Sequence, residues 1–259
     1  MRLNRYLSLC GAASRRQADR LIEEGRITVN GVPERRLGIT VDPDRAAVLV
    51  DGRPVRPPRR RSYWLFHKPA GCLCSRGDPW GRPTIYDLLP AALLGLKYVG
   101  RLDQDTEGLL LLTDDGELSD LLTHPSSRIP RTYRARVQGV LRDRELNPLR
   151  QGAAFEGLRY QPAEASTIRA DSRGQTTELE ITIREGKKRE VRNMMRVLGH
   201  RVLGLRRIGF GPLALGRIAP GEVRELASRE VAALQAAVRT ADLPRIALDL
   251  PRIYKKPRR

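Results

Sequence analysis

The sequence predicts an α+β protein with two folded domains, a small one over residues 1–58 and a larger one over residues 62–240. Near the N-terminus, two helical segments are followed by short strands with tight turns. Two prolines and three arginines then interrupt the pattern at 57–61, where neither a helix nor a central strand can continue. Beyond them, several strand-like segments alternate with helical ones. Residues 241–259 are predicted to form a disordered basic tail.

The first helix is short and lies at the start of the chain. Asn4 is expected to cap it, Tyr6, Leu7 and Leu9 belong to it, and Gly11 ends it. Its apolar residues supply part of a core for the small domain.

The second helix has clearer signals, in the segment SRRQADRLIEEG. Ser14 stands at the cap, Gln17 follows three residues later, and Gly25 lies after the end. Its predicted core-facing residues are Ala18, Leu21 and Ile22. Arginines near the start of this helix place positive charge at the positive end of the helix dipole, which is unfavourable. This cost is tolerated more easily when a phosphate is the neighbour.

Two hairpins are predicted after these helices. ITVNGVP enters an Asn-Gly turn and VLVDGRPV an Asp-Gly turn, and these are the residue pairs that two-residue hairpin loops prefer. Two helices and two hairpins make a module of about 55 residues, a size that folds independently.

The charge of the chain indicates a polyanionic partner. The formal net charge is +18 and the isoelectric point is near 10.8. An excess of this size favours phosphate binding, with an affinity that falls steeply as salt rises. A long basic amphipathic helix with an aromatic face, which would favour a membrane surface, is not evident.

Several function classes are disfavoured by what the sequence lacks. No apolar stretch approaches the roughly 18–20 residues of a membrane helix, and the start does not read as a signal peptide. The three cysteines fit a reducing compartment, and with three scattered histidines they do not form a metal-binding pattern. We therefore expect a cytoplasmic monomer with no metal and no cofactor.

The second domain opens with a buried strand, Tyr63–His67, that ends in a Lys-Pro-Ala-Gly turn. A helix-like stretch, TIYDLLPAALL, precedes VGRLDQDTEGLLLLTDDG. In that segment 109–112 is predicted to be a central strand that ends in an Asp-Gly hairpin turn. Asp103 would then lie in the loop just before a buried strand, which is a rigid support for a reactive carboxylate.

Two further segments carry candidate residues. Thr132–Val137 is predicted to be a strand, and Tyr133 is notable because only 5% of the chain is aromatic. TTELEITI alternates polar and apolar residues as a half-buried strand does. After Gly186 we expect a helix from near Lys188, with Arg192 facing either solvent or a cleft. Its apolar stripe comprises Val191, Met194, Met195 and Leu198.

The start of the chain resembles a small RNA-binding domain that a ribosomal small-subunit protein shares with bacterial tyrosyl-tRNA synthetases, here called S-four-like. The similarity runs through RLNRYLSLCGAASRRQADRLIEEGRITVNGVP. The resemblance implies that folded RNA is the polyanion. Six arginines are expected to bind it: Arg2, Arg5, Arg15, Arg16, Arg20 and Arg26.

The larger domain is similar to the RNA pseudouridine synthases, and the S-four-like start indicates their RsuA/RluB branch. Three blocks carry the resemblance in order: GRLDQDTEGLLLLTDDG, RTYRARV and EGKKREVRNMM. The residues of the third block favour the RluB type, which acts on large-subunit 23S rRNA. The RsuA type usually has His-Gln at the positions that Arg189 and Glu190 occupy here. The resemblance implies a mixed, largely antiparallel sheet.

The family's chemistry is an isomerisation in which uracil is detached from ribose, turned and rejoined through carbon, without a cofactor. The resemblance makes Asp103 the essential carboxylate, Arg192 its ion-pair partner, and Tyr133 the residue that stacks on the base and assists proton removal. A cation within about 4–6 Å favours the ionised carboxylate. Three further residues are expected to contact the substrate: Arg101, Ile183 and Lys187.

Other functions remain open at this point. The same scaffold could modify small-subunit 16S rRNA, or could bind rRNA during ribosome assembly without catalysis. Asp103 and Asp105 could also form the carboxylate pair of a glycosidase, although that reaction leaves the positive charge unexplained.

Overall fold

The computed structural model describes residues 1–57, 60–171 and 174–240. The chain divides into two compact units. Unit 1 comprises Met1–Asp120 with Leu215–Ala227, and unit 2 comprises Leu121–Ala214 with the segment that begins at Ser228. The predicted tail at 241–259 and residues 58–59 of the interrupting segment lie outside the described residues. Within the described part of the chain, no helix is both long enough and apolar enough to span a membrane.

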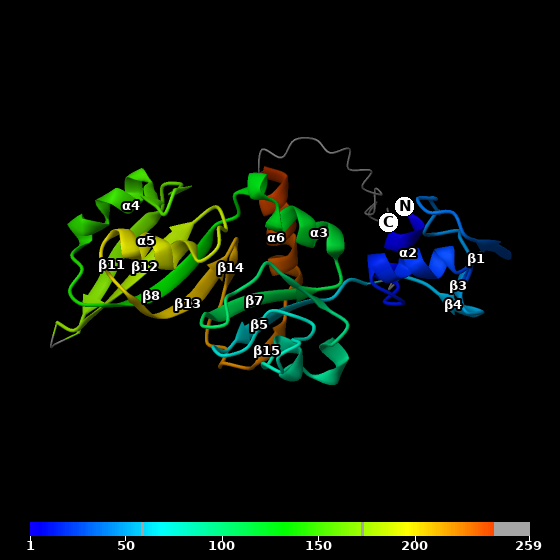
Figure 1. Ribbon diagram of the computed structural model, residues 1–259, viewed down its shortest axis with the longest axis horizontal. Coiled ribbons are helices and arrows are strands. Elements are labelled where there is room, and N and C mark those ends of the chain that lie inside the picture. Colours follow the sequence, from blue (N-terminus) through cyan, green and yellow to red (C-terminus); the bar gives the residue numbers. More distant parts are fainter. Residues whose placement is uncertain (58–59, 172–173, 241–259) are drawn as a thin grey trace, which may run out of the picture. The chain divides into compact units, whose positions relative to one another are not determined.

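The N-terminal module of unit 1 has two helices against a four-stranded antiparallel sheet (Figure 1). The strand order is β2-β1-β3-β4. A separate hydrophobic core, built from residues between Leu3 and Val48, joins helices to strands. The elements are α1 (Leu3–Leu9), α2 (Arg15–Glu23), β1 (Ile27–Val29), β2 (Val32–Glu34), β3 (Val48–Val50) and β4 (Arg53–Val55).

The local signals for the module are confirmed with one exception. Ser14 and Gln17 form the predicted capping box of α2, and Asn30 and Asp51 begin the two hairpin turns with positive φ. Asn4 does not cap α1. The helix starts at Leu3, with Arg2 at the cap position, two residues earlier than a cap at Asn4 requires. Asn4 therefore lies inside the helix, and its side-chain amide donates to Asp19 on α2 at 2.8 Å.

The rest of unit 1 is built around strand β7, which pairs antiparallel with β5 and with β6. On its other edge β5 pairs with β15. A core that includes Phe66, Leu110 and Leu112 packs on this sheet. The elements are β5 (Tyr63–Lys68), β6 (Lys97–Val99), β7 (Glu107–Thr113), β15 (Val223–Glu225) and the 3-10 turns η1 (Ile85–Asp87) and η2 (Ala91–Leu93).

In this region one helical prediction is met only by two short 3-10 turns, and one turn prediction is wrong. The helix-like stretch TIYDLLPAALL forms η1 and η2, because Pro90 lies between them and cannot donate a helical hydrogen bond. Asp115 and Gly116 do not make a hairpin turn; they begin α3 (Gly116–Thr123). The Asp115 carboxylate accepts from the backbone N–H groups of Glu117 and Leu118 at 3.1 and 3.0 Å, and so caps that helix.

Unit 2 contains a four-stranded antiparallel array in the order β11-β12-β8-β13, with β14 on β13 (Figure 1). The predicted strands at 132–137 and 178–183 are confirmed, and so is the α+β class with a largely antiparallel sheet. The strands are β8 (Arg131–Gln138), β9 (Ala153–Phe155), β10 (Leu158–Tyr160), β11 (Glu164–Ala170), β12 (Thr176–Ile183), β13 (Val202–Phe210) and β14 (Leu213–Ala214).

The helices of unit 2 include the one that carries the third sequence block. It begins at Glu190, two residues later than predicted, because Arg189 adopts a left-handed backbone and delays the first helical turn. Its predicted stripe is buried at Val191, Met194 and Met195. The helical elements are η3 (Pro125–Ser127), η4 (Asp143–Leu146), α4 (Asn147–Gln151), α5 (Glu190–Val197) and α6 (Ser228–Thr240).

Candidate active site

Asp103 lies in the loop of a β-hairpin formed by β6 and β7. The loop is anchored on both sides of it, since Leu102 is 5% and Thr106 is 2% exposed. The carbonyl of Asp103 accepts from the Thr106 N–H at 3.1 Å, which closes a turn. Asp103 itself is exposed. The predicted location before a buried strand is therefore correct, and its carboxylate stands on a fixed backbone where a substrate can reach it.

A buried lysine binds the backbone of this loop. The ammonium group of Lys68, the last residue of β5, donates to the carbonyls of Pro69, Asp103, Gln104 and Thr106 at 3.0, 3.2, 3.4 and 2.8 Å. Lys68 is fully buried, and burial lowers the pKa of its ammonium. The sequence patterns did not predict this residue. Its only signal is a cation at the end of a strand that begins with aromatic and apolar residues.

A second attachment ties the loop to the segment after β5. Gly71 N–H donates to the Gln104 carbonyl at 2.7 Å, and the Gln104 side-chain amide donates back to the Gly71 carbonyl at 3.1 Å. Leu102 N–H also donates to the Cys74 sulfur at 3.4 Å. Arg101 and Asp105, on either side of Asp103, are exposed on this braced loop.

Tyr133 is buried at the centre of the sheet of unit 2, with 8% of its surface exposed. It lies on β8 between Ile181 of β12 and Arg207 of β13, its partners in register. Directly opposite residues face the same side of a sheet, so the ring of Tyr133 shares a face with an apolar side chain and a guanidinium.

A buried arginine, Arg207, and a partly buried one, Arg131, form a cationic layer near Tyr133. Arg207 is 1% exposed, and its guanidinium lies over the Phe210 ring at 5.2 Å. Arg131 approaches the same ring at 5.7 Å and donates to the Glu185 carbonyl at 2.7 Å. Burial lowers the pKa of Arg131, and the like charge of Arg207 lowers it further. We did not predict Arg207, because a single arginine in an arginine-rich chain carries no distinguishing signal.

Arg192 lies in the first turn of α5 and is 8% exposed, so it does not face solvent. Its guanidinium donates to the Val202 carbonyl at 3.4 Å. A buried guanidinium is a costly group to retain without a charged role, since it loses its hydration. Its burial is consistent with the predicted catalytic role, which concerns a residue of the other unit and stays a prediction.

Ile183 and Lys187 have different environments. Ile183, at the end of β12, is 3% exposed, as an apolar wall requires. Lys187 is exposed; its ammonium pairs with Glu185 at 2.8 Å, donates to the Arg159 carbonyl and lies 5.6 Å from the centre of the Tyr160 ring. These contacts use part of the donor capacity of the exposed ammonium, and its predicted substrate contact stays a prediction.

Glu190 is a further group that we did not single out for the site. It is 3% exposed at the start of α5, and one carboxylate oxygen accepts from the Lys187 N–H at 2.9 Å. Burial raises the pKa of Glu190 to about 7. This carboxyl therefore titrates near neutral pH within the segment that carries Arg192.

The six arginines expected to bind RNA differ in their surroundings. Arg2, Arg15, Arg16 and Arg20 are exposed. Arg5 pairs with Glu117. Arg26 makes two hydrogen bonds to Asp51, at 2.8 and 2.6 Å, and pairs with Glu24 at 3.1 Å; these contacts raise its pKa. Two of the six are thus engaged by carboxylates, and four present their charge to solvent.

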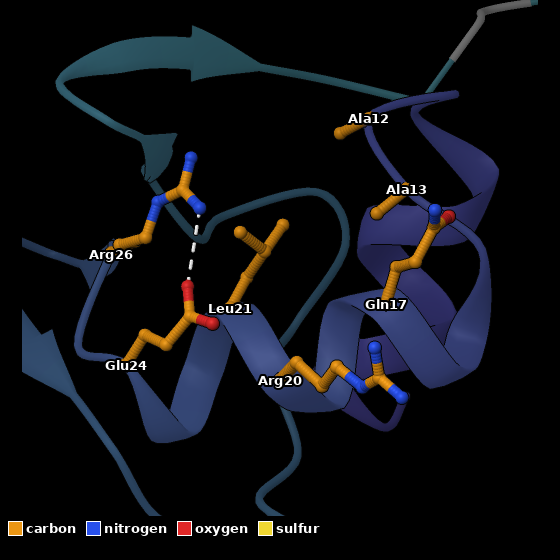
Figure 2. A pocket seen from close by; sticks show the side chains of 7 residues that line it. All are labelled: Ala12, Ala13, Gln17, Arg20, Leu21, Glu24 and Arg26. Carbon is orange, nitrogen blue, oxygen red and sulfur yellow. Dashed lines mark hydrogen bonds and ion pairs between the residues drawn. The ribbon is translucent and has the colours of Figure 1, made fainter.

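A surface cavity of about 310 Å³ adjoins Arg20 and Arg26 in the N-terminal module. Figure 2 shows Gln17 and Arg20 extending from α2, and Arg26 bonded to Glu24 on the other side. The other lining residues are Ala12, Ala13 and Leu21. Among the residues that the structure describes, no cluster of three or more His, Cys, Asp or Glu could hold a metal ion.

Comparison with known proteins gives consistent results. Residues 62–196 match the family described as RNA pseudouridylate synthase, and residues 1–45 match the S4 domain. An uncharacterized RNA pseudouridine synthase of Aquifex aeolicus is 42% identical over 202 residues, which cover 78% of this chain and 80% of that protein. Ribosomal large subunit pseudouridine synthase B of Bacillus subtilis is 37% identical over 199 residues, 77% of this chain and 81% of that protein.

A solved structure is similar as well. A crystal structure of a pseudouridylate synthase aligns with a TM-score of 0.62 at 28% identity, and covers 90% of this chain and 99% of that one. The alignments therefore extend beyond the sequence blocks to most of the chain.

Proposed function

The chain belongs to the RNA pseudouridylate synthase family, and we propose that it converts one uridine of large-subunit 23S rRNA to pseudouridine. The observation that carries this proposal is the exposed Asp103 on a hairpin loop held by Lys68, within the residues that match the family. The choice of the large subunit rests on the relative from Bacillus subtilis and on the sequence of the third block.

The proposed reaction breaks the bond from ribose C1′ to N1 of uracil and forms a bond from C1′ to C5. The C5 proton is lost and N1 gains one, so atoms and electrons balance without a redox partner. Asp103 acts as the essential carboxylate on ribose or base. Confining the detached uracil keeps rejoining faster than loss to water.

The other roles follow from the surroundings of each side chain. Tyr133 offers a ring that stacks on the base and a hydroxyl that assists proton removal from C5. Arg192 supplies the guanidinium that stabilises the Asp103 carboxylate. Arg101 holds the flipped nucleotide, whose unstacking costs a few kcal/mol. Ile183 contributes the apolar wall and Lys187 a contact to the substrate.

We further propose that residues 1–58 and 62–240 act as separate RNA-binding and catalytic domains. The core of the N-terminal module, which uses only its own residues, supports this division. Four exposed arginines of that module, Arg2, Arg15, Arg16 and Arg20, are the proposed contacts to phosphates, joined by Arg5 and Arg26 after exchange of their partners. A cytoplasmic monomer acting on rRNA completes the proposal.

The decisive experiment maps pseudouridines at single-nucleotide resolution in rRNA from cells with and without the gene. One 23S position should lose its modification in the deletion strain and regain it with the parent gene. An Asp103→Asn gene should fail to restore it, while the purified variant still binds rRNA. Loss of a 16S position would redirect the proposal to the small subunit. An unchanged map would support the non-catalytic rRNA-binding role.

A further inference from the structure

We propose that Trp80 is a stacking platform for an unpaired base of the RNA substrate, at a position other than the target uridine. The inference rests on the proposed function, because it assumes an RNA substrate at Asp103. It adds a binding site, in the loop between Ser75 and Arg82, that the family match does not assign.

The exposure of Trp80 is the first observation. Trp80 is 77% exposed, the highest value among the exposed large hydrophobic residues in the described part of the chain. Tryptophan carries the largest apolar surface of any residue, and leaving it in water gives up the free energy that burial would supply. Such a ring is expected to be covered by a partner.

The loop holds this ring in place. The Asp78 carboxylate is 4% exposed and accepts from the backbone N–H groups of Trp80 and Arg82 at 3.1 and 3.0 Å. It also accepts two hydrogen bonds from the Arg82 guanidinium, at 3.0 and 2.6 Å, and these contacts lower the pKa of Asp78 to about 2. The loop is therefore ordered before a ligand arrives, which reduces the entropy lost on binding.

Arg82 also supports the ring directly. Its guanidinium carbon lies 5.0 Å from the centre of the Trp80 ring, within the range of a cation–π contact. The indole ring and the guanidinium are both planar groups that stack on nucleobases, so each of them can contact a bound base. Every base has a π-face, so this site would accept an unpaired base with little sequence preference.

The position of the loop connects it to the reaction. It begins from residues 71–74, which are bonded to the Asp103 loop through Gly71, Gln104 and Cys74. Its base is closed by Leu73, which accepts from Ile85 N–H at 2.9 Å and donates to the Pro83 carbonyl at 2.8 Å. A base stacked on Trp80 would thus belong to the same RNA as a uridine at Asp103.

The test measures RNA affinity and reaction rate separately on a 23S fragment that the parent modifies. Trp80→Ala should raise the RNA dissociation constant roughly 5- to 100-fold, which is the effect of losing one stacked base. The single-turnover rate at saturating RNA should stay within about threefold, because Trp80 is assigned no chemical step. Trp80→Phe should restore most of the affinity. Leu88→Ala, which truncates another exposed apolar side chain of unit 1, is the matched control and should change neither value.

An abasic scan identifies the stacked nucleotide. Removing one base outside the target should weaken binding by the parent as much as Trp80→Ala does, and should have little effect on binding by that variant. Tryptophan fluorescence provides a second measurement. RNA should quench the emission of Trp80 in the parent, and most of this quenching should be absent in Trp80→Phe.

The outcomes separate the two proposals. If the parent modifies the fragment and Trp80→Ala has the parent's affinity, the stacking site is wrong and the proposed function stands. If the parent binds with quenching but forms no pseudouridine in any rRNA, the proposed reaction is wrong and the stacking site stands. If Trp80→Phe is as weak as Trp80→Ala, an aromatic face is not what binds, and the stacking proposal is overturned.

Discussion

The ammonium nitrogen of Lys68 lies 3.2 Å from the carbonyl oxygen of Asp103, and it donates to three more carbonyls around it. An ammonium group has three protons, so these acceptors share them. Lys68 thus fixes the backbone of the loop that carries Asp103 and places a positive charge next to its carbonyls. If Asp103 has the proposed role, Lys68 acts through it as a positioning residue.

Replacing Lys68 by Met should lower kcat on the order of 100-fold with a smaller change in RNA affinity. The variant keeps the length of the side chain but leaves buried carbonyls without their donor, so the loop shifts, and misplacement of a reacting group by about 1 Å costs rates of this size. Single-turnover kinetics and urea unfolding should both be measured. Lys97→Met is the control in the same unit, because that lysine is exposed. A near-normal rate in Lys68→Met would assign Lys68 to stability alone.

Replacing Arg192 by Ala should reduce activity by about 10²-fold or more, as measured by single-turnover kinetics. The reason is electrostatic, because in the proposed reaction the guanidinium stabilises the charge on the essential carboxylate. Because Arg192 is buried, Arg192→Lys should be compared as a variant that retains the charge. Arg196→Ala, on the same helix and exposed, is the control. A near-parent rate in Arg192→Ala would rule out the pairing with Asp103.

Glu190 should make stability depend on pH. Its pKa is raised to about 7, so the folded state holds a proton that the unfolded state releases near pH 4.5. The stabilisation is therefore complete below pH 4.5 and is lost as pH rises through 7. As the pH rises from 5 to 8, the free energy of unfolding measured in urea should fall by roughly 1–3 kcal/mol more for the parent than for Glu190→Gln. Glu156→Gln, an exposed change in the same unit, should behave as the parent, and parallel curves for all three would contradict the assignment.

Deleting residues 1–55 should weaken rRNA binding by about tenfold or more and leave the remaining fold intact. The deletion removes a complete core. It also breaks the exposed hydrogen bond from Lys97 to Ser8 and the ion pair of Arg5 with Glu117, which contribute little to stability. The slope of log affinity against log salt should fall by roughly 0.7–0.9 for each phosphate that is no longer bound. Circular dichroism and thermal unfolding would check the fold, and an unfolded truncation would contradict the two-domain division.

A full-length variant tests the charge without the deletion. Changing Arg2, Arg15, Arg16 and Arg20 to Gln should reproduce most of the reduction in salt dependence, because these side chains are exposed and their removal leaves the core untouched. An unchanged salt slope would assign RNA binding in this module to other groups.

The sequence alone determined the features that depend on a few neighbouring residues. Ser14 and Gln17 cap α2 because their partners lie three residues apart, and the turns at Asn30 and Asp51 need only one following glycine. The alternation in β12 identified its buried face for the same reason. Within the candidate site, the position of Asp103 before a buried strand was predictable, since both belong to one short segment.

Tertiary structure decided the features whose partners are distant along the chain. The loop carbonyls that Lys68 binds lie 35 to 38 residues away, and Arg207 meets Tyr133 only because β13 pairs with β8. Arg26 is engaged by Asp51, 25 residues later, which its sequence neighbours do not indicate. A buried charge is stable only where the fold brings acceptors to it, and a local pattern does not record which residues those are.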